Sequence, residues 1–270
     1  SMTLNSKIKS QKINPFLIYI IFGTIAFSFN FWVSTRGVFP IDTFLHYDSA
    51  FKILNGEKPV RDFWIIHGIS LDYIQSIFFR LFGVNWVSYI SHSSIFNSII
   101  VVVLFKLLKN LDLSLLNSSI ICLCFLTLAY PVSGVPFIDH HSTFLSFFCF
   151  IIFFYSINNK KYNSILFIPL LFGLAFFSKP VPSSYLIIIF SIIFTIYFWT
   201  ENKIKPFLIL VLGTVLFFFL LILFLKFEKI PLTSFIDQLI LYPLSIGGQR
   251  TEFISDAISN RFFNYKFIYL

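Results

Sequence analysis

The 270-residue chain is 57% hydrophobic and only 12% charged, whereas a soluble domain typically has about 25% charged residues. Together with a mean hydropathy of +0.85, this composition excludes an ordinary soluble domain and predicts an integral membrane protein. The net charge of +8 does not indicate nucleic acid binding, because the lysines fall in small clusters between apolar segments, as on the cytoplasmic side of membrane proteins. The three cysteines lie in apolar runs without zinc-ligand spacing, so they predict no disulfide framework.

Seven apolar runs come close to the roughly 17 to 25 residues that a helix needs to cross a bilayer. The expected spans are residues 15–34, 86–105, 115–131, 141–157, 164–178, 183–199 and 206–226. The third to sixth are short, and we expect them to lie where the bilayer is thin or to end in protein-lined cavities. The pattern predicts an all-α polytopic membrane helix bundle, with residues 1–270 forming one transmembrane module.

Lysine clusters predict the orientation of the bundle. They precede the first span and follow the second, fourth and sixth: Lys7, Lys9, Lys12, Lys106, Lys109, Lys160, Lys161, Lys203 and Lys205. By the positive-inside rule these segments, and the N-terminus, are cytoplasmic. The outer side then receives residues 36–85, 132–140 and 178–182 and the tail 227–270, which we expect to be an outer loop that the chain end interrupts.

The first outer loop, residues 36–85, carries five acidic residues and two predicted amphipathic helices. The first begins at Asp42 as N-cap, has its apolar positions at Phe44, Tyr47, Phe51 and Leu54, and stops at Gly56. The second covers residues 70–81, with an apolar face at Tyr73, Ile74, Ile77, Phe78 and Leu81. We expect both helices to lie along the membrane surface.

Polar residues also gather at the outer ends of later spans. The outer half of the second span is polar and is expected to face the inside of the bundle, with Ser88, Ser91, His92, Ser93, Ser94 and Asn97. Asp139, His140 and His141 lie at the outer start of the fourth span, and Lys179 lies alone at the next outer turn.

These features together resemble the GT-C fold membrane glycosyltransferases, and most nearly the protein O-mannosyltransferase and aminoarabinose-transferase-like enzymes. The resemblance rests on an acid after the first span, surface helices around G-x-x-P-x-R-D-F-W and L-F-G, a second acid before the fourth span and a lysine after the fifth. It covers residues 15–226. It implies transfer of a sugar from a polyprenyl-phosphate donor to a lipid, glycan or protein acceptor at the outer face of the bacterial cytoplasmic membrane.

By that resemblance Asp42 is the general base that takes the proton of the acceptor nucleophile. The family often has Asp-Glu at this position, whereas this chain has Asp42-Thr43, so the contribution of a second carboxylate is in doubt here. His46 follows four residues later on the same helix face, where it could orient Asp42 or share a metal ion with it. The alternative is that Asp42 only caps the helix.

Asp139 matches the second acid of the family, which binds a sugar hydroxyl or a divalent metal. A divalent metal is therefore the one cofactor that the resemblance admits, with Asp139 and His141 as its candidate ligands and His140 as a further substrate contact. The alternative is that Asp139 caps the fourth span while both histidines lie at the membrane interface.

The lipid-phosphate leaving group calls for cations rather than for a general acid. Lys179, Arg61 and Arg250 are the outer-side candidates. Lys179 could instead extend to lipid headgroups, and Arg61 could simply pair with Asp62, a further candidate contact, or with Glu57.

Two other classes of protein remain open. A transporter or flippase would carry ionisable residues at mid-span, whereas here they gather at the outer ends. A non-catalytic member of the same fold would have nearly the same sequence.

Overall fold

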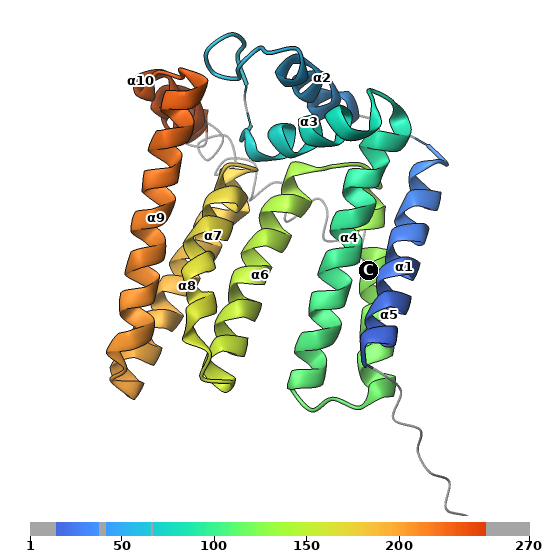
Figure 1. Cartoon of the computed structure of the whole chain (residues 1–270), viewed down its shortest axis with the longest axis vertical. Helices are drawn as coiled ribbons and strands as arrows, with labels where there is room; N and C mark the ends of the chain where they lie inside the picture. The colour runs from blue at the N-terminus through green and yellow to red at the C-terminus, as the bar shows by residue number, and fades with distance from the viewer. Residues whose placement is uncertain (1–14, 38–41, 66, 247–270) are drawn as a thin grey trace, which may run out of the picture. The chain divides into compact units, whose positions relative to one another are not determined.

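The computed structural model describes residues 15–37, 42–65 and 67–246, and in this part of the chain it is all-α (Figure 1). Six of the described helices are long and apolar enough to cross a membrane. They are α1 (Pro15–Ser34), α4 (Trp86–Asn110), α5 (Leu115–Leu128, extended by a 3-10 turn at Tyr130–Val132), α6 (Ile138–Asn158), α8 (Pro180–Glu201) and α9 (Ile204–Glu228). The prediction of a polytopic helix bundle is thereby confirmed.

The fifth expected span, residues 164–178, is shorter than the other six. It consists of the 3-10 helix η2 (Tyr162–Phe167) and the α-helix α7 (Ile168–Phe176), and Pro169 in the first turn of α7 marks the change between them. A 3-10 helix rises about 2.0 Å per residue and an α-helix about 1.5 Å, so the two pieces extend about 25 Å in all. The fifth of the seven expected spans, one of the four that were expected to be short, is therefore a shorter apolar helical segment beside the six long ones.

The chain divides into two compact units, residues 1–40 with 90–135 and residues 41–89 with 136–270. In the first unit, α1 and α5 pack together with most of α4. The polar half of α4 is buried, as predicted: the Nδ2 group of Asn30 on α1 donates to Ser93 Oγ at 3.2 Å and to Ser94 Oγ at 3.0 Å. Asn97 Nδ2 reaches the backbone oxygen of Ala26 at 3.2 Å. Several polar groups of α4, Ser93, Ser94 and the Asn97 amide nitrogen among them, are therefore satisfied by protein partners in this unit.

In the second unit α6, α7, α8 and α9 run back and forth beside one another (Figure 1). Aromatic side chains fill the contact between them, and Phe153, Phe172 and Phe190 are buried with ring centroids 5.2 to 5.3 Å apart in neighbouring pairs. The turn after α6 carries Lys160 and Lys161. This turn and the turn between α8 and α9 lie at the end of these helices opposite to α2 and α3.

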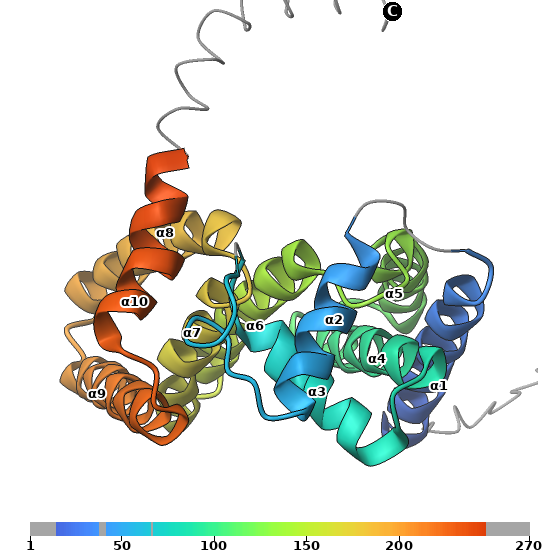
Figure 2. The same cartoon turned by 90° about the horizontal axis from the view of Figure 1, so that it is seen from above.

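Helices α2 (Thr43–Leu54) and α3 (Ser70–Phe82) lie crosswise at that other end of the second unit and pack against each other (Figures 1 and 2). Both were predicted. Their buried residues include polar ones, Thr43, His46 and Ser49 in α2 and Ser70, Asp72, Gln75 and Ser76 in α3, beside the apolar Ala50, Ile53, Leu71 and Phe79. The predicted apolar positions Phe44, Phe51, Ile77 and Leu81 are exposed. A pair of surface helices in contact with lipid would bury polar groups and expose apolar ones in this way.

The connection between α2 and α3 is attached to α9 and to the tail. Lys58 Nζ lies 2.5 Å from Glu228 Oε2, and Gln238 Nε2 donates to the backbone oxygen of Val60 at 3.0 Å. The described part of the tail is helical rather than an open loop. It consists of α10 (Leu232–Ile236), a π-helical turn (Asp237–Leu241) and a further α-helical turn that ends at Ile246. Residues 247–270, and with them Arg250, lie outside the described residues.

Candidate functional site

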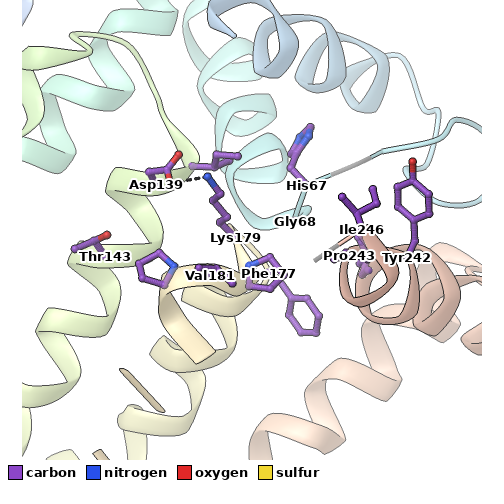
Figure 3. Close-up of a pocket in the computed structure, with 14 residues that line it drawn as sticks. His67, Gly68, Asp139, Thr143, Phe177, Lys179, Val181, Tyr242, Pro243 and Ile246 are labelled. Atoms are coloured by element: carbon purple, nitrogen blue, oxygen red, sulfur yellow. Dashed lines mark hydrogen bonds and ion pairs between the residues drawn. The ribbon is translucent and has the colours of Figure 1, made fainter. Parts of the chain in front are cut away.

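A cavity of about 710 Å³ opens in the second unit where the 177–182 turn meets the start of α6 and the tail helix (Figure 3). Its lining is mostly apolar, with Phe177, Leu239, Tyr242 and several prolines, and its charged side chains are Asp139 and Lys179. His67 also lines it. A mostly apolar pocket with a few convergent polar groups is the usual form of a small-molecule site.

Lys179 and Asp139, two of the predicted residues, form an ion pair in this cavity. The Nζ atom of Lys179 donates to Asp139 Oδ1 at 2.6 Å, and the side chains remain 37% and 41% exposed. Asp139 lies in the first turn of α6 and Lys179 immediately precedes α8, while Ser142 Oγ fixes the Lys179 backbone oxygen at 2.8 Å. The sequence suggested that Lys179 lies alone at its turn. In the structure the Asp139 carboxylate supplies its counter-charge.

Gly68 brings the connection before α3 into contact with the same turn. Its N–H donates to the Ser178 oxygen at 3.1 Å, and the N–H of Ser70 donates to the Phe177 oxygen at 2.8 Å. A Cβ atom on Gly68 would lie 1.9 Å from the Phe177 oxygen, which is far inside van der Waals contact. Only glycine fits this close approach, and the approach places His67 at the wall of the cavity.

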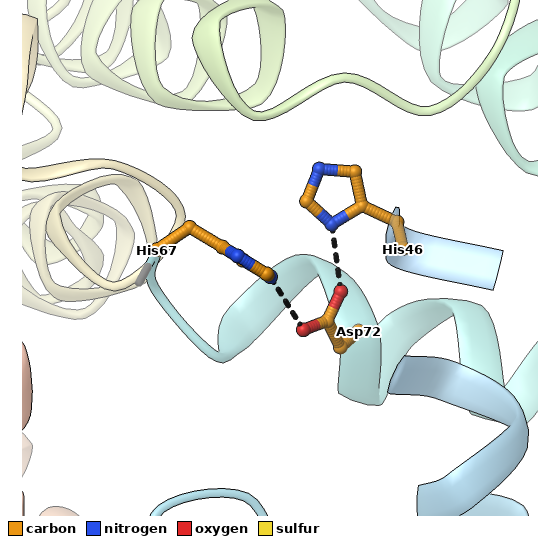
Figure 4. A group of neighbouring side chains, drawn as sticks. All are labelled: His46, His67 and Asp72. Atoms are coloured by element: carbon orange, nitrogen blue, oxygen red, sulfur yellow. Dashed lines mark hydrogen bonds and ion pairs between the residues drawn. The ribbon is translucent and has the colours of Figure 1, made fainter. Parts of the chain in front are cut away.

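His67 belongs to a buried cluster with His46 of α2 and Asp72 of α3 (Figure 4). The Asp72 carboxylate lies between the two imidazoles, with Oδ1 2.8 Å from His46 Nδ1 and Oδ2 2.8 Å from His67 Nε2. The side chains of His46 and Asp72 are fully buried and that of His67 is 4% exposed. The remaining ring nitrogens, His46 Nε2 and His67 Nδ1, are buried without a hydrogen-bond partner among the described residues.

Two members of the cluster, Asp72 and His46, have shifted pKa values. Burial alone would raise the pKa of Asp72, but the hydrogen bonds from His46 and His67 outweigh it and hold that pKa below its usual range. Burial lowers the pKa of His46 by more than Asp72 raises it. Near neutral pH we therefore expect an ionised Asp72 that accepts an N–H from a neutral His46.

Asp42, the predicted base, lies at the N-cap position of α2, as expected, but its side chain makes no capping hydrogen bond and is exposed. It is not among the residues that line the cavity. Its negative charge acts on His46, one helical turn away. The catalytic role of Asp42 stays a prediction.

Arg61 and Asp62 pair with each other, which is one of the alternatives that the sequence left open. The guanidinium of Arg61 donates to both carboxylate oxygens of Asp62 at 2.8 and 2.7 Å and to the Glu228 backbone oxygen at 3.0 Å. These hydrogen bonds, with one from the Lys58 N–H, lower the pKa of Asp62 to about 2. Neither residue lines the cavity. Through the hydrogen bond of Arg61 to the Glu228 oxygen, the pair joins the 58–62 connection to α9.

His140 and His141 are not among the residues that line the cavity. His140 is half-buried and packs against the rings of Phe137 and Phe144, while His141 is buried with Nδ1 3.3 Å from the Phe137 oxygen. Within the described ranges, the group of three potential metal ligands is the cluster of His46, His67 and Asp72, which contains neither Asp139 nor His141. A metal at those two residues stays a prediction.

Sequence reasoning named His46 but missed His67 and Asp72. The segment H-G-I-S-L-D holds a histidine and an aspartate five residues apart around a glycine, just before an amphipathic helix. Asp72 is not one of the predicted apolar residues of that helix. Its burial would have been expected only if the polar face of the helix had been predicted to pack against protein.

Comparison with protein-family models, curated proteins and solved structures found no match for this chain.

Proposed function

We propose that the chain is a membrane-embedded glycosyltransferase that uses a polyprenyl-phosphate sugar, with the cavity around Lys179 and Asp139 as the donor site. The observation that carries the proposal is the Lys179–Asp139 pair in an otherwise mostly apolar cavity. A polyprenyl-phosphate sugar has the same character, since an anionic phosphate joins an apolar chain. The partly exposed ammonium group can pair with the phosphate, and Asp139 is then available for a sugar hydroxyl.

The proposed reaction is a single displacement with inversion at the anomeric carbon. The acceptor hydroxyl attacks that carbon while its proton passes to the carboxylate of Asp42, and the carbon–oxygen bond to the phosphate breaks. The phosphate leaves with the bonding electron pair, and Lys179 stabilises the negative charge that develops on it. The assignment of Asp42 rests on the resemblance of the first loop to the glycosyltransferases.

We place the cavity on the outer face of a bacterial cytoplasmic membrane. The support for this orientation is the position of two lysine pairs at the other end of α6 to α9: Lys160 with Lys161 in the turn after α6, and Lys203 with Lys205 at the start of α9. Lysine-rich connections of this kind stay on the cytoplasmic side.

The experiment that tests the proposal is transfer of labelled sugar from polyprenyl-phosphate hexose or pentose donors by the purified chain in vesicles. We expect Lys179→Met and Asp42→Asn each to lower the transfer rate by roughly 10²- to 10³-fold. Lys203→Met is the matched control, because Lys203 also pairs with an acid at 2.6 Å and is 41% exposed, but lies in the turn between α8 and α9. Equal rates for the wild type, Lys179→Met and Asp42→Asn would reject the proposal.

A further inference from the structure

We propose that His46, His67 and Asp72 form a binding site for one divalent transition-metal cation of the zinc class. Each residue offers one ligand atom, and these atoms all lie within 4.8 Å of one another. The usual distance from zinc to imidazole nitrogen or carboxylate oxygen is about 2.0 to 2.2 Å. Small movements of three side chains are therefore enough to place all three atoms around one ion.

The charge of the cluster favours a cation. Asp72 is fully buried, and its partners are the two histidines; within the described part of the chain no lysine or arginine pairs with it. A carboxylate that is buried so completely is stabilised by a positive charge beside it, because burial of an uncompensated anion is strongly unfavourable. A bound cation supplies that charge at the place where both imidazoles already point.

The unpartnered ring nitrogens show that each imidazole has a second nitrogen free to carry its proton. A neutral histidine carries one N–H, and His46 Nε2 and His67 Nδ1 are buried without any partner among the described residues. An ion beside Asp72 would take the lone pairs of the nitrogens that face the carboxylate, His46 Nδ1 and His67 Nε2, and the ring protons would then lie on the unpartnered nitrogens. Imidazole lone pairs are the commonest metal ligands in proteins, through either nitrogen.

The donor set points to the kind of metal. Two imidazoles and one carboxylate suit zinc and its neighbours in the first transition row, whereas calcium and magnesium prefer oxygen ligands alone. Three protein ligands leave a fourth position for water or for another ligand. Because the ligands come from α2, α3 and the connection before α3, the ion would join three segments of the second unit, and this role does not depend on glycosyl transfer.

The test measures metal content and metal-dependent stability of the 270-residue chain in detergent. The protein is stripped with a chelator, loaded with zinc chloride, freed of excess metal and analysed by mass spectrometry for zinc. We expect about one equivalent in the wild type and less than about a tenth in His67→Gln and Asp72→Asn. The matched control is His140→Gln, because His140 is a half-buried histidine of the same unit outside the cluster, and it should retain the full equivalent.

Two measurements on the wild type keep the test independent of variant folding. Cobalt chloride, loaded in place of zinc, should give the visible absorption bands of a low-coordinate nitrogen and oxygen site, and zinc at about 100 times its Kd should raise the folded-to-unfolded ratio about 100-fold. Wild type that binds no zinc and gains no stability from it would overturn the proposal, as would full zinc content in both variants. In that case the hydrogen bonds to His46 and His67 alone stabilise the Asp72 carboxylate, and sugar transfer, measured separately, remains untouched by the result.

Discussion

Replacement of Gly68 by alanine should destabilise the second unit strongly. A Cβ atom at this position would lie 1.9 Å from the Phe177 oxygen and 2.1 Å from the Phe177 carbonyl carbon. Ordinary contact begins near 3.4 Å, so the connection and the end of α7 would have to separate by roughly 1.5 Å, the difference between these distances. A shift of that size breaks both backbone hydrogen bonds that Gly68 and Ser70 donate at 3.1 and 2.8 Å.

The magnitude follows from these two effects. Each lost hydrogen bond costs about 0.5 to 1.5 kcal/mol, and overpacking adds about 1 to 3 kcal/mol. We therefore expect Gly68→Ala to lower the free energy of unfolding by about 2 to 6 kcal/mol, measured by titration of the chain from mild detergent into dodecyl sulfate.

Gly37→Ala is the matched control. A Cβ atom at Gly37 meets nothing within 4 Å, so this variant should stay within about 0.5 kcal/mol of the wild type. If Gly68→Ala unfolds at the same dodecyl sulfate fraction as Gly37→Ala, the close contact with Phe177 does not exist and the placement of His67 at the cavity is wrong.

Three further predictions concern interactions away from that contact. Glu228→Gln removes the charge that pairs with Lys58 at 2.5 Å, and the half-buried lysine left behind should cost about 2 to 3 kcal/mol in the same titration; no loss would mean that the pair is solvated. Asn30→Ala removes two donations to serine oxygens in the first unit and should cost about 1 to 2 kcal/mol, whereas an unchanged midpoint would place Asn30 in lipid. Because its pKa is lowered from 3.8 to about 2, ionised Asp62 should stabilise the chain fully above about pH 4, and this contribution should be lost as the pH falls toward 2. Asp62→Asn should make the fall in stability over this range smaller without abolishing it, because Asp72 also has a lowered pKa, and a fall as large as that of the wild type would contradict the Arg61 pair.

The helices were predictable from sequence because apolar runs of membrane length leave little choice of structure. Residues 15–34, 183–199 and 206–226 lie within α1, α8 and α9. The run at 164–178 was expected to be short, but hydropathy gave no sign that the segment begins as a 3-10 helix, which extends further per residue than an α-helix. In α2 and α3 the periodicity identified both helices and the apolar positions Phe44, Phe51, Ile77 and Leu81, which are exposed as on helices that lie along a membrane surface. It gave no sign of the polar residues His46 and Asp72 that the two helices bury.

The site was predictable only in part. Asp139 and Lys179 were named because charged residues at the ends of apolar spans are conspicuous, and the structure brings them together in one cavity. His67 and Asp72 were missed because their neighbourhood depends on the packing of α2 on α3 and on the contact between Gly68 and Phe177. Contacts of this kind join residues far apart in the chain, and spacing along the sequence carries no direct sign of them.

The contact at Gly68 also constrains how this chain can change in length. The last carbonyl groups of a helix have no partners within it, and here the carbonyls that follow α7, at Phe177 and Ser178, receive the N–H groups of Ser70 and Gly68. One extra residue in α7 would turn those carbonyls by about 100° and leave the incoming N–H groups without acceptors. Residues 65–70 and 162–178 are therefore matched pieces, which a chimera or a natural recombination event must exchange together.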